Sequence, residues 1–447
     1  MQKRTYFTCI GTMLLMLIFT SCKDLLDLEP PQSLSNETAL DNDEGVKQAL
    51  NGAYDRFSQG SLMGGEVMRN AELFGGEGEI IWDGTYTAPR EIWERNILVT
   101  NIDVAGFWTA AYECINTCNN VLHAIDVVDP ADQDEVQGQA LVLRAWCLFE
   151  LTRMFGQQYI SGVDNTQLAV PIITEPTLQL GDNSDVIRNS VEECYAAVIA
   201  DLIQAETLLP ENNGVLVNKH TATGLLARIY LQQGDYTSAR DKADAVISSN
   251  DFHLESAYAD CFNQDNDSDE DIFDVQVSTT DGTNVMNEFF ATPANGGRGD
   301  ILIEESFIDL FDTLDTRKAL FYQSGGSWYT GKFNNEYGNL PLMRLAEMIL
   351  IRAECNERLG TDVGATPLED YNAIHTRAGL EAAVAVTLDD VLLERRLELA
   401  FEGFKVHDVK RQHLMVGTME FNDPKFIYPI PEGEIEVDPL LVQNPGY

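Results

Sequence analysis

Positive charge is scarce in this 447-residue sequence. Only 29 lysines and arginines stand against 72 aspartates and glutamates, which gives a formal net charge of −43 at pH 7. Proteins bind nucleic acids chiefly through basic side chains that neutralise phosphates, so this composition excludes a nucleic-acid ligand. It equally opposes adsorption to an anionic lipid surface. The charge balance therefore leaves a neutral ligand, such as a sugar, or a cationic ligand.

Catalytic signatures are also missing from the sequence. It contains no G-x-S-x-G, H-E-x-x-H or G-x-x-x-x-G-K-[ST] motif, and its six histidines form no recognisable constellation. The acidic run 265–274 fails as an EF-hand loop, because the chain has Glu270 and Gln276 where that loop needs glycine and glutamate. We therefore expect a protein that is not an enzyme and holds no cofactor. A structural calcium ion elsewhere stays open.

The apolar run near the start of the chain, from Cys9 to Phe19, is too short to cross a bilayer, which needs about 20 apolar residues. With a basic head before it, the run predicts a secretory signal peptide over residues 1–21. The run ends in Thr20-Ser21-Cys22, which resembles a bacterial lipobox, so Cys22 is the expected lipidation site. Residues 22–35 would then tether the protein to the outer membrane. An ordinary signal peptide with an incidental cysteine is the alternative.

Six cysteines remain beyond this leader, namely Cys114, Cys118, Cys147, Cys194, Cys261 and Cys355. The first two share one helix face, but further metal ligands are not clustered nearby in the sequence, which argues against zinc. We expect most of the six to be small buried hydrophobic residues. A disulfide stays open for an exported protein.

Hydrophobic residues recur at helical spacing through the middle and end of the chain. Steps of three and four residues run through 136–155, 222–233 and 236–247, which predicts amphipathic helices. The last two segments are separated by Gln233-Gly234-Asp235, where Gly234 can supply a left-handed helix stop. Their small and aromatic residues fall at the spacing of a tetratricopeptide repeat. The sequence thus predicts a mainly α fold, a helical-repeat scaffold with loop-rich insertions and minor β structure.

Charged residues inside the helical runs are expected to stabilise this scaffold. Arg144 and Arg344 should pair with acids of neighbouring helices. The segment 394–411 carries an apolar stripe at helical spacing, which favours a role in the core over catalysis. Its residues expected to form ion pairs along helices are Glu394, Arg395, Glu398 and Arg411.

Seven segments stand out for their order along the chain: LNGAYDRF (50–57), RAWCLFELTRMFG (144–156), RNSVEECYAAVIADLIQAETLLP (188–210), ARIYLQQGDYTSARDKADAVI (227–247), PLMRLAEMILIRAECNERLG (341–360), ERRLELAFEGFKVHDVKR (394–411) and QNPGY (443–447). Together, behind a lipobox, they resemble the SusD/RagB family. Its members are surface lipoproteins of Bacteroidetes-type bacteria that capture nutrients for an outer-membrane transporter.

The resemblance implies one helical domain over 36–447, with an N-terminal part of about 36–210 and a C-terminal part of about 211–447. It implies a non-catalytic receptor, exposed at the cell surface, that binds an oligosaccharide and delivers it to a SusC-like TonB-dependent transporter. A peptide ligand, as in RagB-like members, is the alternative within the family, and the negative charge would suit a basic peptide. A surface glycoside hydrolase is the less favoured alternative. The periplasmic face of the membrane also stays open.

Two stretches interrupt the helical pattern, 60–106 and 262–340, and we expect them to be loops that converge on one binding face. Sugar-binding members of the family stack aromatic rings on sugar faces, so Trp82, Trp93 and Trp328 are the first candidates for ligand contact. The weaker candidates from the same stretches are Tyr329, Phe289, Phe290, Arg298, Arg69 and Glu72. The alternative is that these rings pin the loops to the core, as we expect of Trp108 and Trp146.

Overall fold

The computed structural model describes residues 40–177, 185–280 and 282–447. Within these ranges fifteen α-helices outnumber six short strands, so the fold is mainly α, as the sequence predicted. None of the described helices is both long and apolar enough to span a membrane. The predicted signal peptide, Cys22 and the tether lie outside the described residues.

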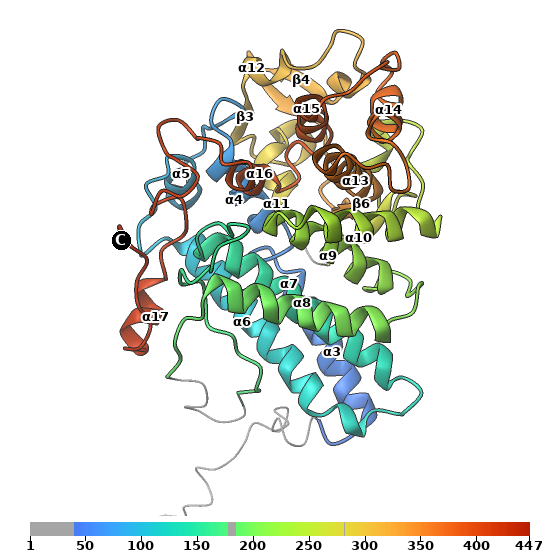
Figure 1. Ribbon diagram of the computed structural model, residues 1–447. Coiled ribbons are helices and arrows are strands. Elements are labelled where there is room, and N and C mark those ends of the chain that lie inside the picture. Colours follow the sequence, from blue (N-terminus) through green and yellow to red (C-terminus); the bar gives the residue numbers. More distant parts are fainter. Residues whose placement is uncertain (1–39, 178–184, 281) are drawn as a thin grey trace, which may run out of the picture.

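Seven long helices form the frame. They are α3 (Asp43–Phe57), α6 (Ile102–His123), α7 (Gln133–Phe155), α8 (Val191–Leu208), α9 (Lys219–Gln233), α10 (Tyr236–Ser249) and α13 (Leu345–Leu359). Helix α7 packs against α3, α6 and α8, and the stacking then continues from α8 to α9, α10 and α13. In Figure 1 the first four of these helices lie in the lower half of the molecule, below α9, α10 and α13.

The α9–α10 pair is the predicted tetratricopeptide-like unit. Gly234 ends α9 with φ of 74°, a left-handed conformation that glycine adopts without a Cβ clash. Asp235 follows directly, and its side chain accepts a hydrogen bond from the backbone N–H of Ser238 to start α10. The helix stop read from the sequence at Gly234 is therefore confirmed, and the structure adds the Asp235 cap.

Eight shorter helices complete the described part of the fold, most of them at the upper end of the frame and α17 at the lower left in Figure 1. They are α4 (Glu66–Gly75), α5 (Thr87–Trp93), α11 (Val285–Phe290), α12 (Glu305–Ile308), α14 (Pro367–Arg377), α15 (Leu388–Glu398), α16 (Lys405–Arg411) and α17 (Glu432–Val437). The strands are β1 (Ile80–Trp82), β2 (Asp271–Val275), β3 (Ile301–Ile303), β4 (Phe321–Ser324), β5 (Ser327–Thr330) and β6 (Leu340–Arg344). Antiparallel pairing gives one sheet in the order β1-β3-β5-β4 and a second sheet of β2 and β6.

The stretches 60–106 and 262–340, expected as irregular loops, contain much of this short regular structure, which corrects the prediction. Their glycines mark turns between elements rather than continuous loops. Gly325 and Gly326, with φ of 61° and 92°, form the two-residue turn between β4 and β5. Two successive positive φ angles suit a tight hairpin whose twist matches its strands.

Aromatic rings join the helical frame to the second sheet. Trp146 of α7 is fully buried, and its ring centroid lies 5.6 Å from Phe57 of α3 and 5.8 Å from Phe273 of β2. Trp108 of α6 is likewise buried. Both tryptophans thus belong to the core, as predicted. The six cysteines of the described ranges are free and buried, which confirms their expected role as small hydrophobic residues.

Arg144 and Arg344 form the predicted ion pairs. Arg144 of α7 pairs with Asp201 of α8 at 2.8 Å. Arg344 belongs to a larger buried group, which we call the ion-pair hub and which comprises Arg317, Lys332, Arg344, Arg377, Glu270, Glu394, Glu398 and Glu402. Glu394 and Glu398 of α15 pair across elements, with arginines that precede α15 in the chain. Arg411 pairs along α16 with Asp408 at 2.6 Å, as expected.

The last residues of the chain close the C-terminal end of α7. Asn444 donates hydrogen bonds from Nδ2 to the backbone oxygens of Phe155 (2.9 Å) and Tyr428 (2.6 Å). The buried Arg188 donates to the Asn444 side chain at 2.7 Å and to the backbone oxygens of Val442 and Ala169. We call this arrangement the C-terminal clasp, because it satisfies carbonyl groups that a helix end otherwise leaves unpaired.

Candidate ligand-binding site

The structure separates the nine candidate contact residues into interior and surface positions. The interior set, none of which exposes more than 4% of its surface, is Arg69, Glu72, Trp82, Phe289 and Phe290. Rings with so little exposed surface cannot stack on a ligand, and the Arg69 and Glu72 side chains already have partners within the protein. Their burial therefore corrects the prediction that these five residues contact the ligand.

Packing between α4, β1 and α11 explains why they are buried. The Arg69 guanidinium lies 4.4 Å from the centre of the Phe289 ring and forms an ion pair with Asp103 of α6. Trp82 lies on the inner face of β1, with its ring 5.6 Å from Phe289. Phe290 packs at 5.4 Å from Phe333. These side chains hold α4 and β1 against the rest of the fold.

The other two tryptophans are partly buried. Trp93 packs against the core and donates a hydrogen bond from Nε1 to the backbone oxygen of Ile80 at 3.1 Å. Trp328 packs against the core from β5, where it pairs with Ile303 of β3. Successive strand residues point to opposite faces, so Tyr329 projects away from Trp328.

Tyr329 and Arg298 belong to a surface that we call the aromatic face, formed by Tyr86, Arg298, Asp300, Tyr322 and Tyr329. The Tyr322 and Tyr329 rings stack across the β4–β5 hairpin, with centroids 5.9 Å apart and planes at 27°. The Arg298 guanidinium lies 4.3 Å from the centre of the Tyr86 ring, which is 45% exposed. Its Nε donates to Asp300 at 2.6 Å, which fixes the guanidinium over the ring.

Gly299 brings these two aromatic pairs together. Its φ is +68°, and a Cβ at this position would lie 3.3 Å from Cε1 of Tyr329, so the ring packs closely on the loop that carries Arg298. Partial burial raises the pKa of Tyr329, and the neighbouring Asp83 and Asp300 carboxylates raise it further. Polar side chains contact the Tyr322 hydroxyl at 3.3 Å, namely Thr292, Asn295 and Asn334. The face therefore offers open rings surrounded by hydrogen-bonding groups.

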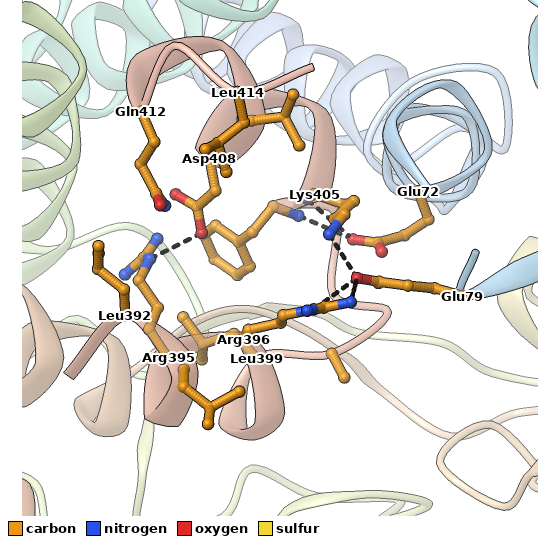
Figure 2. Close-up of a pocket in the computed structure, with 14 residues that line it drawn as sticks. Glu72, Glu79, Leu392, Arg395, Arg396, Leu399, Lys405, Asp408, Gln412 and Leu414 are labelled. Carbon is orange, nitrogen blue, oxygen red and sulfur yellow. Dashed lines mark hydrogen bonds and ion pairs between the residues drawn. The ribbon is translucent and has the colours of Figure 1, made fainter. Parts of the chain in front are cut away.

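A cavity of about 230 Å³ lies between α4, α15 and α16, and Figure 2 shows Glu72 and Glu79 converging there with basic residues. Glu72 accepts backbone N–H groups of Gly403 and Phe404 at 2.8 and 2.9 Å, and Glu79 pairs with Arg396 and Lys405. Burial raises the pKa of Glu72 to about 8, and the Glu79 carboxylate adds to this shift. Most charges in this cavity already have partners, so a neutral sugar would have to disrupt them. On the aromatic face a sugar can contact the exposed Tyr86 ring without disrupting buried ion pairs.

Comparison with known proteins assigns the chain to a family. A family model described as "Starch-binding associating with outer membrane" matches residues 24–231, and a model described as "SusD family" matches residues 321–420. The chain belongs to the SusD/RagB family. It is 24% identical to the SusD-like protein P2 of Formosa agariphila, over 98% of this chain and 99% of that protein.

Solved structures agree with this SusD/RagB assignment. A SusD superfamily protein from Bacteroides thetaiotaomicron is 26% identical, with a TM-score of 0.80 over 90% of this chain and 100% of that chain. The surface glycan-binding protein A of Bacteroides uniformis shares the fold, with a TM-score of 0.75 at 23% identity over 90% of this chain and 99% of that chain.

Sequence reasoning did not select the two other aromatic residues of the aromatic face of this SusD/RagB protein, Tyr86 and Tyr322. Both lie in the stretches that were searched, but the search gave priority to tryptophan. A usable signal was present for Tyr322, because FYQS-GG-SWYT has the form of a two-residue hairpin and places Tyr322 opposite Tyr329. For Tyr86 no local signal existed, since its arginine partner is distant in the sequence.

Proposed function

We propose that this protein is a non-catalytic surface receptor that binds an oligosaccharide on the aromatic face and delivers it to a SusC-like TonB-dependent transporter. The observation that carries the proposal is the exposed Tyr86–Arg298 stack beside the Tyr322–Tyr329 pair. A tyrosine ring presents an apolar face to the C–H groups of a sugar, and its hydroxyl and the nearby amides bind sugar hydroxyls. Family membership supports the same function.

Calorimetry against the best ligand from a glycan array tests the proposed site. Tyr86→Ala and Tyr329→Ala should each weaken binding by about 2 kcal/mol, or about thirtyfold, as expected for loss of a stacking anchor. Tyr371→Ala is the matched control, because Tyr371 is a partly exposed tyrosine of α14 that stacks on His375 outside the aromatic face. Unchanged affinity in both face variants, with unchanged melting temperatures, would contradict the assignment.

The absence of catalysis has its own test. The array ligand incubated with pure wild-type protein should remain intact by chromatography. Shorter products that persist after repeated purification would favour the glycoside hydrolase alternative and contradict the receptor proposal.

The location and transporter partner are part of the proposal. Lipidation at Cys22 would anchor the protein in the outer membrane, where a transporter could receive its ligand. The protein should then co-purify in mild detergent with a large TonB-dependent β-barrel in near-equal amount. Protease treatment of intact cells distinguishes surface exposure from the periplasmic face.

A peptide is the second candidate ligand, and one specific observation favours it. The net charge of −43 would attract a basic peptide and accelerate its association at low ionic strength. A panel of basic peptides, measured beside the glycan array, decides between the two ligand classes.

A further inference from the structure

A second cavity, of about 350 Å³, lies away from the aromatic face and shares no residue with it. We call it the acidic pocket, and it is lined by residues of three segments, 211–218, 251–252 and 267–274. Five of the lining side chains are carboxylates, and none is a lysine, arginine or histidine. An excess of negative charge around a cavity requires either protons bound to the carboxylates or a cation that pairs with them.

The two outer carboxylates already have basic partners. Glu211 pairs with Lys219 at 3.3 Å, and Asp251 lies 2.9 Å from Nε2 of His220. The other three carboxylates, which are Asp267, Asp271 and Asp274, form no ion pair with any described residue, although Arg344 lies near enough to Asp271 to oppose the rise in its pKa. The unbalanced negative charge therefore lies on the segment 267–274, where Asp267 is exposed and Asp274 is buried.

Existing hydrogen bonds satisfy only part of these three carboxylates. The Gln276 side-chain amide donates to Asp267 Oδ1 at 2.6 Å and to Asp274 Oδ1 at 2.9 Å. The backbone N–H of Ser268 donates to Asp271 Oδ2 at 2.7 Å. One oxygen of each β2 aspartate is left over, because Asp271 Oδ1 and Asp274 Oδ2 are buried and have no hydrogen-bond partner in the described part of the chain.

Both oxygens are available to a hydrogen-bond donor that enters the pocket. Asp274 exposes only 3% of its surface, so its free oxygen lies on the buried side of the pocket lining. Burial raises the pKa of Asp274 to about 8 and that of Asp271 to about 6, and the other aspartates of the pocket add to both shifts. Unpaired buried carboxyl oxygens are rare in folded proteins and call for a bound partner.

The shape of the site favours an organic cation over a metal ion. Among the described residues no group of three or more His, Cys, Asp or Glu is arranged to hold a metal. The cavity is also larger than a single ion requires, and Val215, Leu216 and Phe252 give it apolar walls. An ammonium group has three diverging donors that can reach oxygens of two separate carboxylates, whereas a guanidinium pairs best with one carboxylate in plane.

We propose that the acidic pocket binds a primary ammonium group carried on an alkyl stem, with Asp271 and Asp274 accepting its hydrogen bonds and the apolar walls covering the stem. A free alkylamine and a lysine side chain of a peptide both present this group. The pocket would act independently of the aromatic face, so glycan binding and ammonium binding can succeed or fail separately.

Calorimetry of the detergent-solubilised full chain tests the proposal, with n-hexylammonium as the probe and n-hexanol as its neutral counterpart. A parallel titration with Nα-acetyl-lysine methylamide distinguishes a peptide lysine from a free amine. We expect n-hexylammonium to bind and n-hexanol not to bind. Asp274→Asn and Asp271→Asn should each weaken n-hexylammonium binding at least tenfold while the protein stays folded in a thermal melt.

Glu381→Gln is the matched control, because it removes one negative charge at an exposed residue outside the pocket. It should leave the affinity unchanged. Equal losses in Glu381→Gln and Asp274→Asn would show a general charge effect and overturn the proposal. Absence of n-hexylammonium binding to the wild type would also overturn it, as would binding of calcium alone that Asp274→Asn abolishes.

Discussion

Glu398 offers the sharpest test of how the ion-pair hub holds the upper end of the molecule. Its carboxylate is fully buried and meets Arg377 at 2.6 Å, Arg344 at 3.2 Å and Arg317 at 3.4 Å. The change Glu398→Gln keeps the size of the side chain and removes its charge. Three buried guanidinium groups would then share fewer carboxylates, and the shape of the core would stay the same.

The lowered pKa of Glu398 gives the size of the stability loss expected in Glu398→Gln. Burial alone would raise it, but Arg377, Arg344 and Arg317 together lower it from 4.5 to about 2. A difference of this size between folded and unfolded chains corresponds to about 3 kcal/mol of stability. Loss of one partner from a buried ion pair commonly costs a similar amount. We therefore expect Glu398→Gln to lower the melting temperature by roughly 5 °C at pH 7.

The sign of the pH dependence follows from the lowered pKa. The stabilisation by the Glu398 carboxylate is complete above the unfolded pKa of 4.5 and is lost as the pH falls towards 2. The gap in melting temperature between wild type and variant should thus narrow below pH 4.5. The exposed Glu381→Gln serves as the control and should melt like the wild type. A variant that melts within 1 °C of wild type at pH 7, or a gap unchanged down to pH 3, would refute this account of the hub.

Three further outcomes are expected. Trp82→Ala should lower the free energy of unfolding by roughly 3–5 kcal/mol in denaturant titrations, because its ring fills the space beside Phe289; a loss below 1 kcal/mol would place the ring outside the core. Asp274→Asn should raise the melting temperature at pH 8 and have little effect near pH 4, because a raised pKa makes the wild type less stable as the pH increases; an equal effect at both pH values would contradict this sign. Cys22→Ala should block lipid attachment, so the variant should no longer partition into detergent in phase separation; unchanged partitioning would exclude Cys22 as the anchor.

Local signals in the sequence were sufficient to predict the helices of the frame. The α9–α10 pair could be predicted because its period, its glycine stop and its capping residue lie within a few positions of one another. Helix α4 gave no such signal. Every residue from Val67 to Gly75 is buried, and a helix covered on all sides shows no amphipathic period. Arg69 and Glu72 were for this reason assigned to a loop and to ligand contact.

The aromatic face and its surroundings depend on contacts between distant parts of the chain. Trp82 turns inward because β1 pairs with β3, and Tyr86 gains its place because Arg298 packs over its ring. Neither partner can be identified from residues near these positions. Arg298 and Tyr329 reach the surface whereas Phe289 and Phe290 of the same stretch face the core, and the composition could not separate the two pairs.

The C-terminal clasp has a consequence for the order in which the chain folds. Helix α7 ends at Phe155, yet the amide that binds its final carbonyl at 2.9 Å belongs to Asn444, which is synthesised almost three hundred residues later. The stacked helices can begin to assemble earlier, with Arg188 as the other donor to this carbonyl at 3.4 Å, but the shorter hydrogen bond forms only once Asn444 is in place. A chain that stops before Val442 would therefore leave the buried Arg188 without two of its five acceptors, the Val442 oxygen and the Asn444 side chain. The complete chain is therefore expected to be more stable than a chain that lacks these last residues, whether or not a ligand is bound.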